Sequence, residues 1–189
     1  GYYPGASQMA MKLIVDPDTD QILGAQVIGN EGVDKRIDVI ATAMAAGITA
    51  TGLMDLELSY APQFASAKDP INMLGYVNEN RALGERSVQW HEVDDLVADG
   101  WRLIDVRTTG EHSRGAIPGS ELITLDELRD HVEDLAGQKI IVTCRVGQRG
   151  HTAASILRQE GIEVANLDGG YLTWQMGTAA RTPTELVTT

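Results

Sequence analysis

Two short runs of aliphatic residues near the start of the chain predict a pair of β-strands. They are Met9–Val15 and Ile22–Ile28, and the polar segment Asp16–Asp20 separates them. Aspartate and proline favour tight turns, because proline presets its backbone angle and aspartate can bond to the backbone two residues on. We therefore expect a hairpin that belongs to an antiparallel sheet.

The next hydrophobic pattern has helical spacing. In Asp34–Ala46 the apolar residues fall on one face of a helix, and Gly47 stands where the helix would end. Further on, Asp69 precedes Pro70, which is a favourable N-cap followed by proline at the first helical position. A second helix is expected to run from there through Val77.

The second half of the chain alternates between predicted strands and predicted helices. The strands are Leu103–Val106, Lys139–Thr143 and Glu163–Leu167. A Thr-x-x-Glu capping box predicts a helix over Thr124–Leu135, and another helix follows the strand that ends at Thr143. This alternation predicts a parallel sheet with helices on both faces.

The predicted organisation is therefore an α+β domain followed by an α/β domain. The first is expected over residues 1–80, with an antiparallel sheet and helices, and the second over residues 87–180. The polar residues 81–86 are expected to form a linker, and residues 181–189 a C-terminal tail.

Composition narrows the possible functions. A net charge of −12 argues against binding to nucleic acid, and no apolar run approaches membrane-spanning length. A single cysteine cannot form an internal disulfide, which fits a reducing cytoplasm. We expect a cytoplasmic protein without a nucleic-acid or membrane partner.

The one cysteine, Cys144, stands between a predicted strand and a predicted helix. The segment Arg145–Gly150 that follows it contains two arginines and two glycines. A loop at this place directs successive backbone N–H groups into one concavity, and the helix adds the positive end of its dipole. This environment favours the thiolate, which is the nucleophilic form of cysteine.

Cys144 has two alternative interpretations, an inert side chain or the nucleophile of a phosphatase. A lone cysteine is often an inert, buried hydrophobic side chain, but a position before an arginine-flanked, glycine-containing loop favours a reactive one. A cysteine phosphatase would need the spacing Cys-x-x-x-x-x-Arg. Here Arg149 comes one residue too early and Gly150 holds that place. The shorter loop suits a sulfur atom carried on cysteine better than a tetrahedral phosphate.

Four ordered segments together resemble a rhodanese (sulfurtransferase) domain. They are Leu103–Arg107, Glu111–Ser120, Cys144–Gly150 and Leu167–Tyr171 with Trp174. The resemblance implies that Cys144 takes sulfur from a small donor such as thiosulfate or polysulfide and becomes a persulfide. A thiol or cyanide then removes that sulfur, and no cofactor is required. The loop residues that would surround the sulfur are Arg145, Val146, Gly147, Gln148 and Arg149.

The charged residues near the loop have different expected roles. Arg149 could grip an anionic substrate or pin the loop through carbonyl groups. Arg145, beside the nucleophile, is expected to contact substrate. Asp105 and Arg107 could act in catalysis, but the resemblance favours a charge pair that supports the loop.

Two histidines, His112 and His151, are candidate bases or metal ligands. The chain has no second cysteine and no histidine pair at ligand spacing. We therefore expect no metal site, and we expect both histidines at the surface or at helix ends.

The first eighty residues resemble the dimerisation domain of flavin-dependent pyridine nucleotide–disulfide oxidoreductases, in the CoA-disulfide reductase and NADH oxidase group. The segments concerned are Gly29–Asp38, Tyr60–Pro62 and Ser66–Met73. Some members of that group end in a rhodanese domain. The resemblance implies a homodimer through residues 1–80 and, for a full-length parent, FAD, NAD(P)H and CoA. The FAD and NAD domains are absent from this chain, so we expect a fragment or a processed chain.

In that family, tyrosines of one subunit reach the CoA-disulfide site of the partner. By motif position these would be Tyr60 and either Tyr2 or Tyr3. The alternative is that the tyrosines only pack against or cap the sheet.

The function predicted from the sequence is thus a sulfurtransferase module with its persulfide on Cys144, in a flavin-dependent CoA-disulfide or polysulfide reductase or NADH oxidase. Two alternatives stay open. One is a rhodanese-like module that binds proteins without catalysis, and the other is a segment that serves only dimerisation and regulation.

Overall fold

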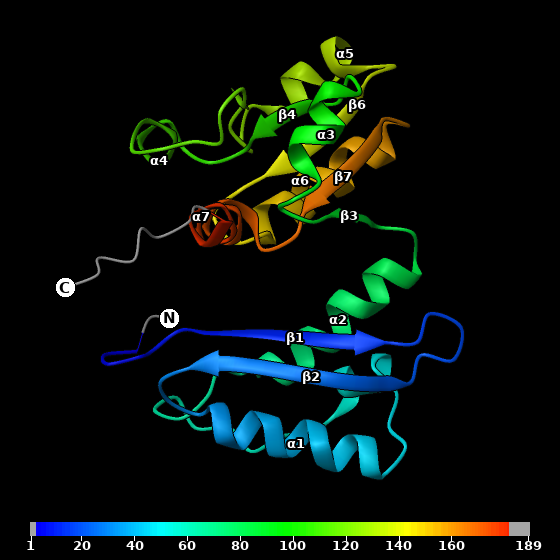
Figure 1. Cartoon of the computed structure of the whole chain (residues 1–189), viewed down its shortest axis with the longest axis vertical. Helices are drawn as coiled ribbons and strands as arrows, with labels where there is room; N and C mark the ends of the chain where they lie inside the picture. The colour runs from blue at the N-terminus through cyan, green and yellow to red at the C-terminus, as the bar shows by residue number, and fades with distance from the viewer. Residues whose placement is uncertain (1–2, 182–189) are drawn as a thin grey trace, which may run out of the picture. The chain divides into compact units, whose positions relative to one another are not determined.

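A computed structural model describes residues 3–181 of the 189-residue chain. The chain divides into two compact units, unit 1 (Gly1–Gly84) and unit 2 (Glu85–Thr189) (Figure 1). In the part of the chain that the structure describes, no helix is both long and apolar enough to cross a membrane.

Unit 1 begins with the expected hairpin. Strands β1 (Met9–Val15) and β2 (Ile22–Gly29) pair antiparallel. In the turn between them the Asp16 carboxylate accepts N–H groups of Asp18 at 2.9 Å and Thr19 at 3.2 Å. These bonds are the turn chemistry that the sequence predicted for this segment.

Three helical segments complete unit 1, namely α1 (Val33–Ala45), the 3-10 turn η1 (Thr51–Asp55) and α2 (Pro70–Ala82). Asp69 caps α2 as predicted, because its carboxylate accepts the N–H of Ile71 at 3.1 Å. The same carboxylate binds Arg36 of α1 at 2.8 Å, and both side chains are buried. Helix α2 continues to Ala82, so the first residues expected in the linker are helical.

Unit 2 is built on a five-stranded sheet in the order β3-β7-β6-β4-β5, in which every pairing is parallel. The strands are β3 (Arg86–Val88), β4 (Arg102–Asp105), β5 (Glu121–Leu122), β6 (Lys139–Thr143) and β7 (Glu163–Leu167). Strand β6 lies in the middle, and both of its neighbours are hydrogen-bonded to it. A parallel sheet of this kind is buried on both faces.

Alternate residues of β6 serve two separate cores. Ile140 and Val142 pack toward one face, and Ile141 packs toward the other. The first face is covered by η2 (Leu128–His131), α5 (Val132–Leu135) and α6 (Gln148–Gln159), and the second by α3 (Val93–Ala98) and α7 (Gly170–Arg181). A short helix, α4 (Thr109–Ser113), follows β4.

The predicted fold class is confirmed: a small antiparallel sheet with helices is followed by a parallel sheet with helices on both faces. The helix predicted from Thr124 is wrong in extent. There the Thr124 hydroxyl donates to the carboxylate of Glu127 at 2.7 Å, and helical structure starts only at Leu128. A true capping box needs the hydroxyl to accept a backbone N–H, and the structure has one at Thr108 with Glu111.

Several elements were not predicted. Strands β3 and β5 and helix α4 are short, so they carry little periodic signal. Helix α7 begins at Gly170, the second of two adjacent glycines, where no helix was predicted. The expected tail falls almost wholly on residues 182–189, which lie outside the described residues.

Candidate active site around Cys144

Cys144 directly follows the central strand β6. Its side chain is buried, and its Sγ accepts the backbone N–H of Gly147 at 3.2 Å. Residues 144–147 form a tight loop, and α6 starts at Gln148. The thiol therefore lies at the carboxyl ends of the strands, where open parallel sheets place their ligands.

Gly147 gives the loop its shape. Its φ of +98° lies in the left-handed region, which glycine adopts without steric penalty. Its carbonyl accepts the N–H of His151 at 2.8 Å and the side-chain amide of Asn166 at 3.2 Å. Asn166, which comes from the neighbouring strand β7, is not among the site residues predicted from the sequence.

The start of α7 holds the loop from the other side. The N–H of Tyr171 donates to the Cys144 carbonyl at 2.7 Å, and that of Leu172 donates to the Arg145 carbonyl at 3.1 Å. Gly170 has a φ of +59°, and a side chain there would lie 2.5 Å from the Cys144 carbonyl oxygen. Glycine is thus needed at position 170, because the backbones of helix α7 and the loop approach each other so closely there.

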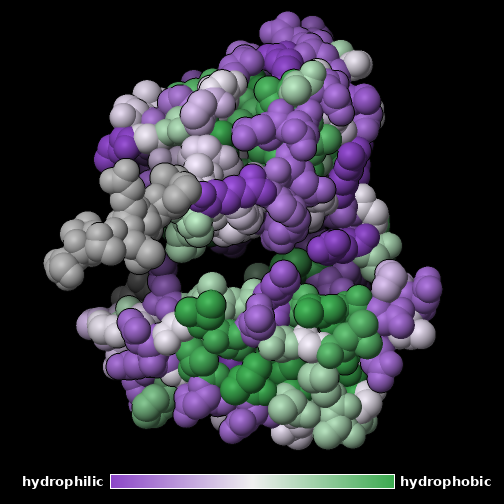
Figure 2. All heavy atoms as spheres, in the orientation of Figure 1, coloured by the Kyte–Doolittle hydropathy of each residue, from purple (hydrophilic) through white to green (hydrophobic). Residues whose placement is uncertain are grey.

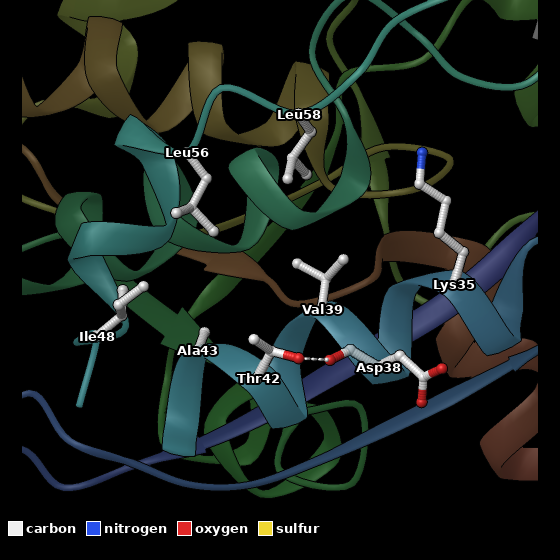
Figure 3. A pocket seen from close by; sticks show the side chains of 8 residues that line it. All are labelled: Lys35, Asp38, Val39, Thr42, Ala43, Ile48, Leu56 and Leu58. Atoms are coloured by element: carbon white, nitrogen blue, oxygen red, sulfur yellow. Dashed lines mark hydrogen bonds between the residues drawn. The ribbon is translucent and has the colours of Figure 1, made fainter. Parts of the chain in front are cut away.

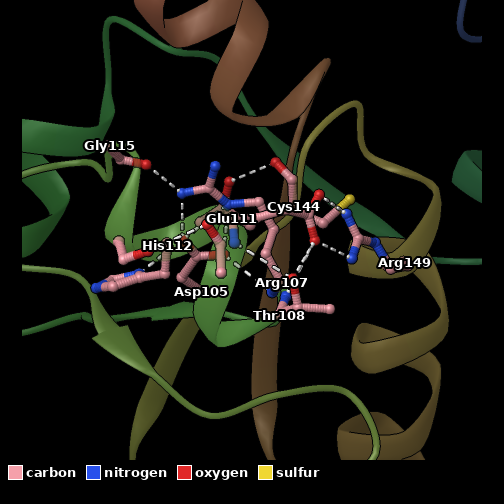
Figure 4. A network of polar contacts seen from close by, with 11 residues as sticks. Asp105, Arg107, Thr108, Glu111, His112, Gly115, Cys144 and Arg149 are labelled. Atoms are coloured by element: carbon pink, nitrogen blue, oxygen red, sulfur yellow. Dashed lines mark hydrogen bonds and ion pairs between the residues drawn. The ribbon is translucent and has the colours of Figure 1, made fainter.

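Arg149 forms a two-pronged ion pair with Glu111 of α4. The terminal nitrogens Nη1 and Nη2 of Arg149 each donate to one carboxylate oxygen of Glu111 at 2.7 Å (Figure 4). Hydrogen bonds from Arg149 hold the pKa of the Glu111 carboxyl far below its usual range, and Glu111 in turn raises the pKa of Arg149. Cys144 acts on the pKa of Arg149 in the same direction. The partner of Arg149 is thus a carboxylate, whereas the sequence predicted an anionic substrate or loop carbonyl groups.

A buried network lies next to this pair. Arg107 binds the Asp105 carboxylate at 2.6 Å, and His112 Nδ1 lies 3.0 Å from the same carboxylate. Burial raises the pKa of Asp105, but the hydrogen bonds from Arg107 and His112 outweigh it, so the net shift is downward. Arg107 also donates to the Gly115 carbonyl at 2.7 Å and lies over the Tyr171 ring at 4.3 Å. These contacts join α4, the following loop and α7 around the site.

The remaining loop residues face solvent. Arg145, Val146 and Gln148 are exposed, and within residues 3–181 the backbone N–H groups of Arg145 and Val146 have no hydrogen-bond partner. His151, the second candidate base, instead pairs with Glu85 at 2.5 Å. Among the described residues no cluster of His, Cys, Asp and Glu could hold a metal ion.

The candidate tyrosines belong to unit 1. Tyr3 is 43% exposed and Tyr60 is 50% exposed, whereas Tyr2 lies outside the described residues. Unit 1 also carries an apolar pocket of about 460 Å³ between α1 and the segment 48–58 (Figure 3). It is lined by Lys35, Asp38, Val39, Thr42, Ala43, Ile48, Leu56 and Leu58.

Comparison with known proteins assigns each unit. The profile of the rhodanese-like domain matches residues 89–176, and that of the pyridine nucleotide-disulphide oxidoreductase dimerisation domain matches residues 1–70. The chain joins this dimerisation domain to a rhodanese domain. The fused arrangement expected from the sequence is confirmed.

Relatives share this arrangement. The crystal structure of reduced Bacillus anthracis CoADR-RHD superposes with a TM-score of 0.92 at 49% identity, over 96% of this chain and 33% of that chain. A NAD-dependent persulfide reductase from A. fulgidus gives a TM-score of 0.81 at 34% identity, over 92% of this chain and 31% of that one.

A coenzyme A disulfide reductase of Staphylococcus aureus strain bovine RF122 / ET3-1 is 47% identical over 75 residues, which is 40% of this chain and 17% of that protein. The chain thus spans about a third of the two structural relatives and less of the reductase.

Proposed function

We propose that the rhodanese domain is a sulfurtransferase that carries a persulfide on Cys144. The observation that supports this most is the position of Cys144 Sγ at the end of the central strand. It accepts the N–H of Gly147, and it lies next to the start of α6 and to Arg149. Backbone N–H groups, a helix N-terminus and a guanidinium all stabilise negative charge on sulfur.

The reaction proceeds by two displacements. The Cys144 thiolate attacks the outer sulfur of a donor, a new S–S bond forms, and the donor leaves as sulfite or as a thiolate. A thiolate or cyanide acceptor then attacks the terminal sulfur of the persulfide, and the Cys144 thiolate leaves. No net electrons are exchanged with the protein, so the domain itself needs no redox cofactor.

The other predicted residues have separate roles in this proposal. Arg145, exposed beside the nucleophile, attracts anionic donors to the mouth of the site. Arg149 stabilises charge on the persulfide while Glu111 holds it in place. Asp105 and Arg107 support the loop, because Arg107 donates to the Gly115 carbonyl and lies over the ring of Tyr171.

Sulfur transfer from thiosulfate to cyanide tests the proposal. The chain should form thiocyanate, and after thiosulfate treatment its intact mass should rise by one sulfur atom. Cys144→Ala should abolish both signals, and Arg158→Gln, an exposed substitution on the same helix, should leave them unchanged. Equal activity of the chain and Cys144→Ala would instead support the binding module without catalysis.

The relatives suggest a larger setting. We propose that the persulfide exchanges sulfur with a flavin-dependent CoA-disulfide or persulfide reductase site, which would use FAD, NAD(P)H and CoA bound outside this chain. A reactive free thiol of this kind suits a reducing cytoplasm.

We further propose that the dimerisation domain forms a homodimer. Three elements of unit 1 expose large apolar side chains that could contact a second copy: Met44 on α1, Phe64 in the loop 60–67, and Met73 and Val77 on α2. Arg36 holds that loop through the Phe64 carbonyl, so the loop is ordered for contact. Figure 2 shows further hydrophobic atoms over the hairpin face, where Ile14, Leu23 and Ile28 are exposed.

In such a dimer Tyr3 and Tyr60 would be available to a CoA-disulfide site of the partner. Titration of a full-length parent, whose flavin domains would supply the CoA site, with CoA disulfide tests this role. Tyr60→Phe should weaken binding, and an unchanged affinity in both Tyr60→Phe and Tyr3→Phe would leave the tyrosines with packing alone.

A further inference from the structure

Asn166 is a polar residue on strand β7, whose neighbouring residues pack into the apolar cores on both faces of the sheet. Along β7, Ala165 and Leu167 pack into the core under α3 and α7, whereas Val164 packs into the core under α6. Asn166 shares the α6 face by strand alternation and is only 8% exposed. Its Oδ1 has no hydrogen-bond partner among the described residues.

An unpaired buried amide oxygen disfavours folding, so packing does not explain Asn166. Leucine has nearly the same shape and would leave nothing unsatisfied. A buried polar group that is only half satisfied points to a role outside stability.

The other half of the amide identifies that role. Asn166 Nδ2 donates to the carbonyl of Gly147 at 3.2 Å, and Gly147 is the residue whose own N–H donates to Cys144 Sγ at 3.2 Å. Apart from this amide, the one group within residues 3–181 that donates to the Gly147 carbonyl is the N–H of His151. The side chain of Asn166 therefore holds the carbonyl of Gly147, while the N–H of the same glycine contacts the sulfur of Cys144.

Gly150 makes room for this arrangement. It is buried in the first turn of α6, and a side-chain carbon at this position would overlap Asn166 Oδ1. Any larger residue at 150 would thus displace the amide from Gly147. Gly150 stands where a cysteine phosphatase would have its arginine, and the need for space beside Asn166 explains the glycine at this position.

We propose that Asn166 is a positioning residue for the active-site loop, which keeps the Gly147 N–H directed at the sulfur of Cys144. This inference rests on the proposed sulfurtransferase function. It predicts that Asn166 affects the reactivity of Cys144 without contributing to stability.

Asn166→Leu is the direct test, because the change keeps the shape and removes the donor. Alkylation of Cys144 by iodoacetamide and transfer of sulfur from thiosulfate to cyanide should both become about tenfold slower. The loss should lie in kcat rather than in KM for thiosulfate, and the melting temperature should stay equal or rise. Wild-type rates in Asn166→Leu would overturn the proposal.

A double-mutant cycle with Gly150 gives an independent test if Asn166→Leu does not fold. Gly150→Ala should slow alkylation strongly in the native background but have little further effect in the Asn166→Ala background, where the space is vacant. Additive effects of the two changes would overturn the proposal. If the native chain never transfers sulfur, the proposed function fails, and the alkylation rates alone decide the role of Asn166.

Discussion

The side chains of Arg149 and Glu111 form the ion pair beside the nucleophile Cys144. Arg149→Gln removes the cation that stabilises charge on the sulfur, so sulfur transfer should fall about a hundredfold, as for other groups placed against a developing charge. Arg158→Gln on the same helix is the matched control. A rate within a factor of about two of the native rate would contradict the role given to Arg149.

The same pair has a pH signature. The pKa of Glu111 is lowered in the folded protein from its ordinary value of 4.5, so the carboxylate contributes stability above that pH and loses it as the pH falls toward the folded pKa. Glu111→Gln should therefore lower the melting temperature at pH 7 more than at pH 3. Calorimetry at both pH values checks this, and an equal loss at both would show that the charge of Glu111 is not what matters.

For single residues, the sequence predicts which side chains are reactive better than it predicts their contact partners. Cys144 and its two flanking arginines could be singled out because their spacing is local. The partnership of Arg149 with Glu111 spans 38 residues, and that of Asn166 with Gly147 spans 19. Such pairs depend on how strands and helices are brought together, which no local pattern reports.

Among the elements, the first turn of α6 carries Arg149 at a fixed angle. An alanine inserted between Gln148 and Arg149 should turn the arginine by about 100° around the helix axis and break its pair with Glu111. Sulfur transfer should fall at least as far as in Arg149→Gln. The same insertion after Arg158, near the helix end, is the control. Faster hydrolysis of aryl phosphates than sulfur transfer in the native chain would contradict the argument from loop length.

Asp69 connects two helices of the dimerisation domain, as cap of α2 and partner of Arg36. Asp69→Ala leaves a buried guanidinium without its carboxylate, so the free energy of unfolding should fall by about 3 kcal/mol. Asp55→Ala, at an exposed position in the same unit, is the control. Denaturation by urea measures both, and equal stability of the two variants would show that the ion pair contributes nothing.

Elements with strong periodicity or clear caps were predictable, and short ones were not. The hairpin and α2 follow from turn and cap residues within a few positions. The Thr124 motif failed because its hydroxyl bonds to the Glu127 side chain instead of the backbone. Sequence alone does not distinguish these two uses of the same residues.

For the whole molecule, the exposed apolar residues of the dimerisation domain lead to a prediction about assembly. The full chain should be a dimer in light scattering at tens of micromolar, because a dimerisation interface buries a large apolar area. Phe64→Glu with Val77→Glu should give a monomer. Met176→Glu, at an exposed apolar site in the rhodanese domain, should not. A monomeric native chain would contradict the assembly while leaving the sulfurtransferase proposal untouched.

The strand order of the rhodanese domain has a consequence for how the protein is made. Of the strands that the structure describes, β3, the first of this sheet, is hydrogen-bonded to β7 alone, the last. The clamp on the Cys144 carbonyl comes from α7, later still. A nascent chain on the ribosome therefore cannot close this sheet or lock its catalytic loop until residue 171 has emerged. Reactivity at the thiol should thus be acquired only after the start of α7 has been synthesised.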